Sequence, residues 1–392
     1  MSKYDFDELI DRHGTGSVKW DENGSGDPNS KDVIPLWVAD MDFKAAPPIL
    51  EAVRQRAEHG VFGYTVVEDN YYEAIISWFH RRHGWTILRE EILYTTGVVP
   101  AMSVAIKALT MPGEKVLILS PDYNCFFSSI RNNGCEVLET VLRRTGDTFE
   151  VDFEDFEAKC ADEKTTVFLL CNPHNPCGRV WTKTELMHMN DICMKYGVKV
   201  VSDEIHCELI MPGHKFQPFA AVSEQCRQNS VILNSPSKSF NIAGLQAANI
   251  ICSQPEWRRR IDRAININEV CDLNPFGPVS LIAAYNESED WLDALNIYLW
   301  ENYQALCSFA AEHLPDWKVC RLEGTYLPWI DITAIGMKSQ DYCDGLFNKA
   351  KVWVNPGTMY GPCSGEGYIR LNIACPRSRL LEALERIAEI TK

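Results

Sequence analysis

The sequence around Lys238 is more typical of a reactive lysine than of a lysine on a solvated helix surface. Lys238 occurs in NSPSKSFN, just past the apolar run SVILN, among serine, proline and asparagine. A lysine amine becomes a Schiff-base nucleophile when its neighbours lower its pKa. The adjacent hydroxyl groups of Ser235 and Ser237 could bind an anion. Because S-x-S-K is a short motif, it indicates covalent amine chemistry only together with other residues.

A carboxylate, Asp203, ends another apolar run in VVSDEIH. Burying a charge is costly unless it is paired. Two interpretations are open at this point: Asp203 caps the following segment, or it faces a cationic heterocycle. The second is what pyridoxal phosphate (PLP) requires, because its pyridinium nitrogen must stay protonated to act as an electron sink.

Two further polar segments follow apolar runs. The paired Asn-Pro steps in NPHNPCG (172–178) force a tight turn, and Asn175 could also donate to a phenolic oxygen of a cofactor. Gly97, Val98 and Val99 open a helical pattern, and the free backbone N–H groups of a helix start suit a phosphate. Each segment also has a purely structural interpretation, as a turn or as an ordinary helix start.

These residues depend on a regular alternation of short apolar runs and helical patterns. Helices are predicted over 97–111 and 182–197, and strands over 115–120, 135–142, 165–171, 198–203, 230–235 and 247–252. Continuous Val, Ile and Leu runs that alternate with helices predict a parallel sheet covered on both faces. Such sheets bind ligands at the carboxyl ends of their strands, which is where these polar segments fall.

The chain of 392 residues is too long for one core, because single cores stop growing at roughly 250–300 residues. The pattern changes after about residue 290, where a long amphipathic helix over 291–314 leads to a smaller α+β unit. We therefore expect an α/β fold with a large domain over 47–288. A discontinuous small domain is expected over 1–46 and 289–392.

Composition excludes several classes of partner. A net charge of −16 repels phosphate backbones and anionic lipid, so neither nucleic acid nor membrane is expected as a partner. No apolar stretch reaches the roughly 20 residues that span a bilayer, and no signal peptide is evident, which predicts a cytoplasmic protein. No metal site is expected, because no C-x-x-C pair occurs and the histidines are scattered. His80 and His83 are predicted as helix-surface residues.

The order and spacing of these features carry more information than any one of them. Over nearly its whole length the chain resembles the fold-type I PLP enzymes of the class I/II aminotransferase group. Within that group it resembles the MalY/PatB type of cystathionine β-lyase, also called cysteine-S-conjugate β-lyase or C–S lyase. The segments that carry this resemblance are DRHGTGSVKWD (11–21), WVADMDFKAAPPI (37–49), HGVFGYT (59–65), SDEIH (202–206), SKSFNIAGLQ (237–246) and YIRLNIACPRS (368–378).

The resemblance implies a PLP-transferase-like fold and a set of cofactor contacts. Lys238 would carry the Schiff base and move the Cα proton, Asp203 would pair with the pyridine nitrogen, and Asn175 would bond the phenolic oxygen. Tyr123 would stack on the pyridine ring. The phosphate would be held by the backbone of Val98 and Val99 with Ser235 and Ser237.

The resemblance also implies contacts with a substrate and with a second subunit. Arg370 would bind the substrate carboxylate in a two-pronged contact, and Asp40 lies in a segment that would line the substrate pocket. Tyr64 would reach the phosphate of the neighbouring subunit, which predicts a homodimer.

Two positions depart from the wider aminotransferase pattern. His206 stands where many aminotransferases have a tyrosine, three residues after the pyridine-binding aspartate, and Gln246 stands where they have a phosphate-binding arginine. His206 is expected to be either a packed, hydrogen-bonded residue or a polar contact beside the cofactor. The phosphate would meet less positive charge here than in those enzymes.

The predicted reaction is α,β-elimination of L-cystathionine or a related L-cysteine S-conjugate to a thiol, pyruvate and ammonia. An aminotransferase is the first alternative, because the same lysine and the same proton transfer serve both reactions. A regulatory protein that acts through its surface is the second, although the sequence has no helix-turn-helix signature.

Overall fold

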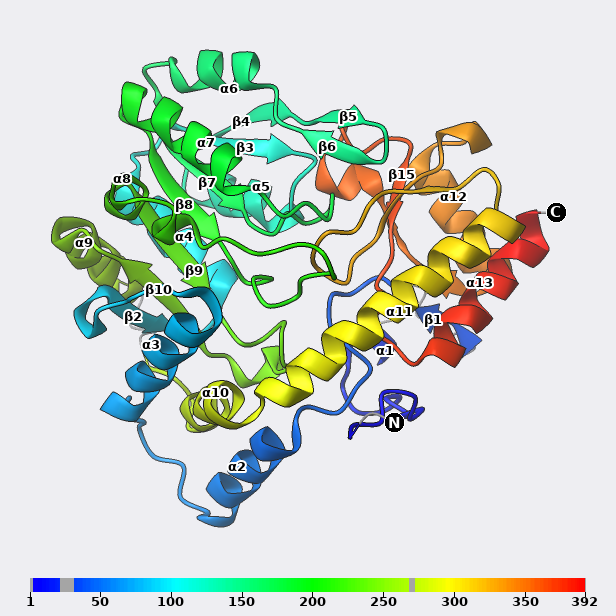
Figure 1. The fold of residues 1–392 in the computed structure, drawn as a ribbon, viewed down its shortest axis with the longest axis horizontal. Helices are drawn as coiled ribbons and strands as arrows, with labels where there is room; N and C mark the ends of the chain where they lie inside the picture. Colours follow the sequence, from blue (N-terminus) through cyan, green and yellow to red (C-terminus); the bar gives the residue numbers. More distant parts are fainter. Residues whose placement is uncertain (1–2, 22–31, 268–271, 392) are drawn as a thin grey trace.

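The centre of the protein is a seven-stranded sheet (Figure 1). The computed structural model describes residues 3–21, 32–267 and 272–391. In spatial order the strands are β2 (Ile92–Thr95), β10 (Ala248–Cys252), β9 (Ser230–Asn234), β8 (Lys199–Asp203), β7 (Thr165–Cys171), β3 (Lys115–Ser120) and β4 (Glu136–Val141). The predicted α/β fold is confirmed.

One strand of this sheet runs against the others. The pairs from β9 through β8, β7 and β3 to β4 are parallel, whereas β10 is antiparallel to both β9 and β2. The prediction of a mostly parallel sheet is confirmed, and the run 247–252 is its antiparallel strand. The chain passes from β9 to β10 through the loop that carries Lys238, without the crossover helix that a parallel return normally uses.

Alternate residues of the strands serve the two faces of the sheet. Val116 and Ile118 of β3 pack into one apolar cluster, and Leu117 and Leu119 pack into another. Continuous apolar strands are expected when both faces are covered. Helices α4 (Val98–Leu109), α5 (Asn124–Asn132) and α9 (Pro255–Asn266) cover the first face; α6 (Phe153–Cys160), α7 (Lys183–Tyr196) and α8 (Glu224–Gln228) lie over the second.

The helices predicted from the sequence are present within a few residues. Helix α4 covers most of the predicted 97–111. Helix α7 begins with a capping box between Thr182 and Glu185 and ends at Gly197, whose φ of 74° is left-handed. The long helix predicted over 291–314 is α11 (Glu289–His313), which follows α2 (Pro47–Glu58), α3 (Asp69–His83) and α10 (Phe276–Glu287).

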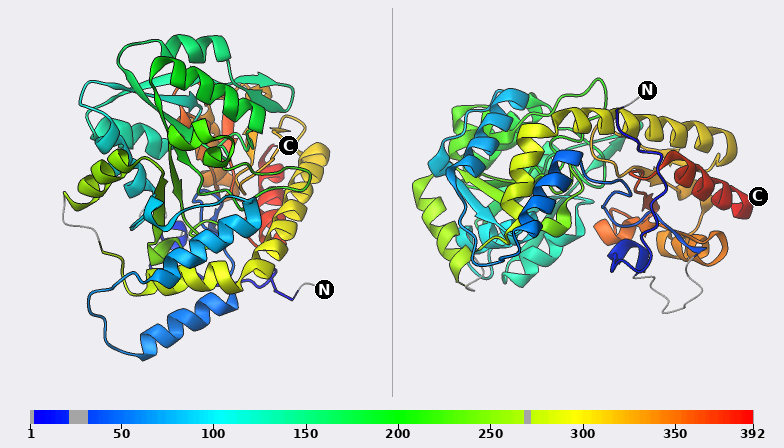
Figure 2. Two further views of the ribbon diagram at one scale, coloured as in Figure 1. Left: turned by 60° about the vertical axis from the view of Figure 1, so that its left-hand side comes forward. Right: turned by 90° about the horizontal axis from the view of Figure 1, so that it is seen from below.

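A smaller unit lies to one side of the main sheet, together with the N-terminal segment (Figure 2). Its four-stranded sheet has the order β11 (Lys318–Val319), β12 (Trp329–Asp331), β15 (Tyr368–Arg370) and β14 (Asn355–Pro356), with helices α12 (Ser339–Gly345) and α13 (Arg377–Thr391). Strand β1 (Ile34–Pro35) pairs in parallel with β13 (Val352–Trp353). The N-terminal segment thus joins the C-terminal unit, whereas the predicted domain boundaries stay a prediction.

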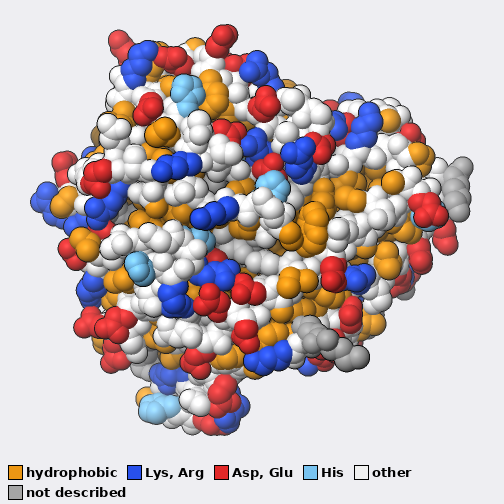
Figure 3. Space-filling model, in the orientation of Figure 1, with side chains coloured by type: hydrophobic (Ala, Val, Ile, Leu, Met, Phe, Trp, Pro, Cys, Tyr) orange, Lys and Arg blue, Asp and Glu red, His pale blue; other side chains and the backbone are white. Residues whose placement is uncertain are grey.

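Three short elements complete the chain. Helix α1 (Val18–Asp21) belongs to the N-terminal segment, and strands β5 (Arg143–Thr145) and β6 (Thr148–Glu150) form an antiparallel hairpin. On the face seen in Figure 3, acidic and basic side chains are interspersed, so the negative net charge is not gathered there. Within the described ranges, no helix combines the length and the apolar character needed to cross a membrane.

Candidate active site

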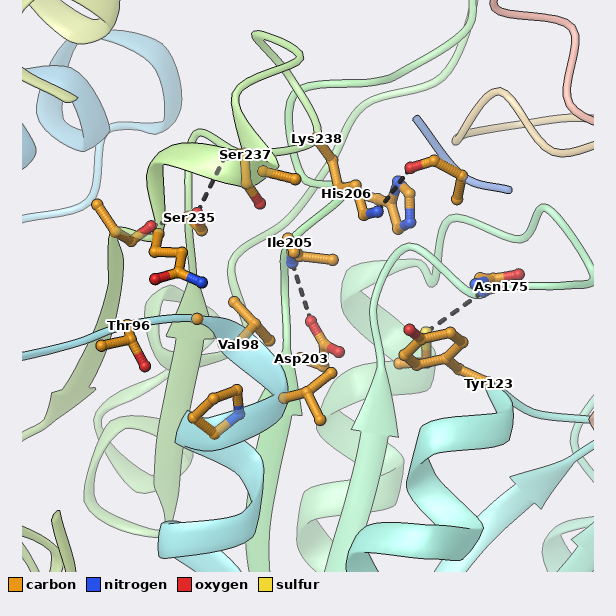
Figure 4. Close-up of a pocket in the computed structure, with 18 residues that line it drawn as sticks. Thr96, Val98, Tyr123, Asn175, Asp203, Ile205, His206, Ser235, Ser237 and Lys238 are labelled. Atoms are coloured by element: carbon orange, nitrogen blue, oxygen red, sulfur yellow. Dashed lines mark hydrogen bonds between the residues drawn. The ribbon is translucent and has the colours of Figure 1, made fainter. Parts of the chain in front are cut away.

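A cavity opens at the carboxyl ends of the parallel strands (Figure 4). It is lined by residues from the N-terminal end of α4, the ends of β7 to β9 and the loop before β10. The predicted site residues that line it are Val98, Val99, Tyr123, Asn175, Asp203, His206, Ser235, Ser237 and Lys238. Parallel strands end at the same edge of a sheet, which is why residues more than a hundred positions apart meet here.

Lys238 lies on the loop between β9 and β10 and points into the cavity. Its Nζ donates a hydrogen bond to the backbone carbonyl of Ala39, 2.6 Å away. Burial lowers the pKa of the Lys238 amine to about 8, and Asp40 and Asp203 oppose that shift. A lysine with such a pKa supplies neutral amine near neutral pH, as a nucleophile or a proton acceptor must.

Asp203, the last residue of β8, is a buried carboxylate at the cavity wall. Its Oδ1 accepts from the backbone N–H of Ile205 at 3.1 Å (Figure 4). Among the described residues, no basic side chain forms an ion pair with it. Burial raises the pKa of Asp203 to about 7. A buried carboxylate without a cationic partner offers a place for a positively charged ring.

Asn175 and Tyr123 form the opposite wall of the cavity. The Oδ1 of Asn175 accepts from Arg370 at 3.1 Å, so the amide group points its Nδ2 donor away from that arginine. The backbone N–H of Asn175 donates to Cys171 Sγ at 3.3 Å, which fixes the turn after β7. Tyr123 stands at the start of α5, and its ring faces the cavity.

The other end of the cavity is rich in hydrogen-bond donors. Val98 and Val99 occupy the first turn of α4, where backbone N–H groups have no partner within the helix. Ser235 donates its hydroxyl proton to the Ala247 carbonyl (2.6 Å) and accepts from the backbone N–H of Ser237 (3.0 Å). The Ser235 hydroxyl therefore stabilises the loop, and the Ser237 hydroxyl is the one more available to donate to a ligand.

Sequence reasoning missed Thr96, which also lines this end of the cavity. A hydroxyl directly before the glycine that opens a helix was the available signal. Gln246, noted as a departure, lines the cavity too and adopts a left-handed φ of 53°.

His206 is both packed and in contact with the cavity. The residue is 3% exposed, and its ring meets that of Tyr326 edge-on at 5.9 Å. Burial lowers its pKa to about 3, and the charges of Lys238 and Arg370 act in the same direction. Its Nδ1 is buried without a hydrogen-bond partner among the described residues. His206 is therefore a neutral polar group beside Lys238.

Arg370 and Asp40 lie behind the lining of the cavity. Arg370 donates to Asn175 and, at 2.9 Å, to the carbonyl of Trp37, and its guanidinium stands 4.6 Å from the ring centre of Tyr360. Asp40 is bound by Arg12 at 2.8 Å. The backbone of the neighbouring residue, Ala39, is what reaches the cavity.

Tyr64 lies outside this cavity. It belongs to the loop between α2 and α3, at the edge of the molecule. Tyr64 is fully exposed, and three other apolar side chains of this loop are exposed as well: Val61, Phe62 and Val66. The chain does not bring Tyr64 to its own cavity.

The prediction that His83 is a helix-surface residue is wrong. Its side chain is 8% exposed, and its Nε2 lies 2.7 Å from Glu208. With Cys207 these two residues form a group of potential metal ligands within 4.8 Å of one another. Glu208 also accepts from Trp78 and Arg82, so the carboxylate is already fully engaged. The sequence could not indicate this cluster, because its members come from segments more than a hundred residues apart.

Comparison with known proteins agrees with this geometry. Residues 31–387 match the family model of aminotransferase class I and II. Cystathionine beta-lyase PatB of Bacillus subtilis is 40% identical over 382 residues, covering 97% of this chain and 98% of that protein. The structure of cystalysin from Treponema denticola, which contains pyridoxal 5'-phosphate, superimposes with a TM-score of 0.96 at 35% identity and covers 99% of this chain and 98% of that one.

A further solved structure extends the likeness to an inhibited enzyme. The PLP-bound C–S lyase from Staphylococcus hominis, in complex with L-cycloserine, superimposes with a TM-score of 0.91 at 32% identity, and the alignment covers 98% of each chain. The family match spans nine tenths of the sequence, and the cavity lies at the sheet edge where the motifs converge. This chain belongs to the aminotransferase class I and II family.

Proposed function

We propose that this chain is a PLP-dependent C–S β-lyase, which converts L-cystathionine or a related L-cysteine S-conjugate into a thiol, pyruvate and ammonia. The observation that carries the proposal is the cavity in which a lysine of lowered pKa and an unpaired buried carboxylate stand together. The similarity to PatB and to the solved C–S lyase of Staphylococcus hominis supports the choice of reaction.

The residues of the cavity fit PLP. Asp203, which has no ion-pair partner among the described residues, would hold the pyridinium nitrogen, the Nδ2 of Asn175 would donate to the phenolic oxygen, and the Tyr123 ring would stack on the pyridine. The first turn of α4, with Ser237 and Thr96, would hold the phosphate. When bound, PLP supplies a covalent attachment for the amino acid and an electron sink for the Cα carbanion.

The side chains of the chain perform the acid–base work. Lys238 would supply the amine that binds the cofactor and would take the proton from Cα, which its lowered pKa favours near neutral pH. Asp203 would keep the proton on the pyridine nitrogen. Arg370 has donors beyond those given to Asn175 and Trp37 and would bind the substrate carboxylate.

A homodimer is part of the proposal, with Tyr64 of one subunit completing the phosphate site of the other. The exposed apolar loop around Tyr64 supports this arrangement, because such a patch marks an interaction surface. Mixing the variants Tyr64→Ala and Lys238→Ala tests it: activity should return in the mixture, because mixed dimers contain one intact site. The cytoplasmic location stays a prediction.

The reaction is tested with L-cystathionine and no added keto acid. Stoichiometric pyruvate and free thiol are expected, and a panel of β-substituted L-amino acids then ranks the leaving groups. Product that forms only after a keto acid is added would identify an aminotransferase instead. An absorption band that disappears on borohydride reduction, and is missing in Lys238→Ala, tests the lysine linkage independently of turnover.

A further inference from the structure

A short segment, residues 37–43, holds the amine of Lys238, and we call it the strap. Its Ala39 carbonyl accepts both from Lys238 Nζ at 2.6 Å and from the hydroxyl of Tyr326 at 2.8 Å. The strap belongs to the N-terminal part of the chain, almost two hundred residues before Lys238. Whatever fixes the strap therefore also fixes the surroundings of this amine.

The backbone of the strap is anchored by side-chain amides. Asn355 donates to the carbonyl of Trp37. Asn372 donates to the carbonyls of Val38 and Asp40, both at 2.6 Å. Asn241 exchanges hydrogen bonds with the backbone of Met41. These three amides are uncharged anchors, and they act beside charged ones, since Arg12 donates to the Met41 carbonyl and Lys19 to the Asp40 carbonyl, both at 3.1 Å.

Beneath the strap lies a network of two cations and two carboxylates. Arg12 binds Asp42 at 2.7 Å and Asp40 at 2.8 Å, and Lys19, whose side chain is fully buried, binds Asp42 at 2.8 Å. Trp20 Nε1 donates to Asp42 at 2.9 Å. Both oxygens of Asp42 are thus engaged by partners that do not depend on Asp40.

Asp40 is held less completely than Asp42. Its Oδ2 is bound by Arg12, whereas its Oδ1 is buried without a hydrogen-bond partner among the described residues, and Lys19 stands 3.8 Å from it. Asp40 directly follows the residue whose carbonyl accepts from Lys238. Arg12 is therefore the one strong hydrogen-bonded partner that the described chain gives to the Asp40 carboxylate.

Several charged or titratable groups surround the Lys238 amine. They are Asp40, Arg370, Asp203, Cys125 and His206. Of the charged groups, Asp40 contributes most to holding the amine in its protonated form, against the larger effect of burial. An ion pair between Asp40 and Lys238 would stabilise the ammonium ion, which can neither attack nor accept a proton.

We propose that Arg12 is a positioning residue that binds the Asp40 carboxylate and thereby keeps it from forming an ion pair with Lys238. The proposal rests on the proposed function, in which Lys238 is the reacting amine. In this arrangement Arg12 never touches the substrate. Because Arg12 occupies the Asp40 carboxylate, the neutral carbonyl of Ala39 remains the hydrogen-bond acceptor for Lys238.

The test is a pH titration of the absorption band of the lysine–PLP linkage in the holoenzyme. Arg12→Gln should raise the apparent pKa of the linkage by about one unit, because a carboxylate released next to Ala39, whose carbonyl accepts from Lys238, favours the protonated form. Arg82→Gln is the matched control. Its side chain is 21% exposed, like that of Arg12, and it also binds a buried carboxylate, Glu208, together with the more exposed Glu289 and Asp293, none of which lines the cavity of Lys238. The control should titrate like the wild type.

A second substitution separates this role from a structural one. In an Asp40→Asn background, Arg12→Gln should no longer shift the titration, because residue 40 carries no charge and Asp42 is still held by Lys19 and Trp20. An unchanged or lowered pKa in Arg12→Gln, or an equal rise in the Asp40→Asn background, would overturn the proposal. If Arg12→Gln does not fold, Arg12→Lys should give a smaller rise in the same direction, and no rise would overturn the proposal as well.

Failure of the proposed function is distinguishable from failure of this inference. If the wild type and Arg82→Gln lack a borohydride-sensitive band, the lysine linkage itself is refuted. If both show the band and only the behaviour of Arg12→Gln disagrees, the linkage stands and the role of Arg12 falls.

Discussion

Two buried carboxylates, five residues apart in the chain, have opposite surroundings. Asp203 and Glu208 are each 4% exposed. Glu208 is contacted by His83, Arg82 and Trp78, and these partners lower its pKa despite burial. Asp203 accepts one backbone hydrogen bond and has no ion-pair partner among the described residues, and its pKa rises to about 7.

The difference separates a structural carboxylate from a functional one. Glu208 has all its partners within the chain, so it contributes to stability as the protein stands. The charge of Asp203 is buried unfavourably, and a cationic ligand would relieve this cost. Strongly perturbed pKa values in a cavity are typical of functional sites, and here the partner list gives the physical reason.

The largest expected effect is a loss of activity on replacement of Lys238, which lines the same cavity as Asp203. Replacement of Lys238 by Ala should reduce pyruvate release from L-cystathionine by about 10⁴-fold or more, because both the nucleophile and the proton acceptor are lost. The stability of the fold should change little, since Lys238 makes one hydrogen bond, to a backbone carbonyl. Activity within tenfold of the wild type would show that another group does this work.

Asp203→Asn should have the second-largest effect on activity. We expect kcat to fall by about 10²-fold to 10³-fold, because the amide cannot stabilise a positive charge on the pyridine ring. Stability of the protein without PLP should be unchanged or higher, since an unpaired charge is removed. Chemical denaturation of both proteins without PLP, together with steady-state kinetics, measures the two effects; a marked loss of stability would contradict the assignment.

Glu208→Gln should give the reverse result. The free energy of unfolding should fall by about 3 kcal/mol, because Arg82 and His83 lose their buried partner. The kcat of the folded fraction should stay close to that of the wild type, since Glu208 does not line the cavity. If activity falls and stability does not, the contrast between the two carboxylates is mistaken.

The pH dependence of stability sharpens the contrast and is, per pH unit, the smallest effect. Between pH 4 and 7 the unfolded chain releases the Asp203 proton while the folded protein without PLP retains it, so rising pH favours unfolding by about 1 kcal/mol per pH unit from this group. Asp203→Asn should remove this slope. Glu208 has a lowered pKa, so its stabilisation is present above its ordinary pKa and is lost as the pH falls. Urea unfolding at several pH values compares the variants.

Much of the site could be predicted, because its residues follow apolar strands in order along the chain. Tyr123, Asn175, Asp203 and Lys238 were expected at one edge of a sheet, and they line one cavity. The direction of β10 could not be predicted, because an apolar run looks the same in either direction. The helix positions followed from periodicity and from the caps of α7.

Other parts of the site leave no trace in local sequence. The acceptor for Lys238 is a backbone carbonyl, which every residue has, so Ala39 could not be singled out. The motifs around Arg12 and Asp40 contributed to the family resemblance. The ion pair between these two residues, 28 positions apart, could not be predicted from them. His83 was misjudged for the same reason, since its partner Glu208 lies 125 residues away.

The anchoring of the strap has a consequence for how the site is made on the ribosome. The strap and Arg12 leave the ribosome more than three hundred residues before two of the side chains that fix the strap, Asn355 and Asn372. The central sheet can form before they arrive, since its last strand, β10, ends at Cys252. We therefore expect a nascent chain to form its α/β core first and the surroundings of Lys238 later. A translation product that ends before Asn355 should have part of its fold but no active Lys238.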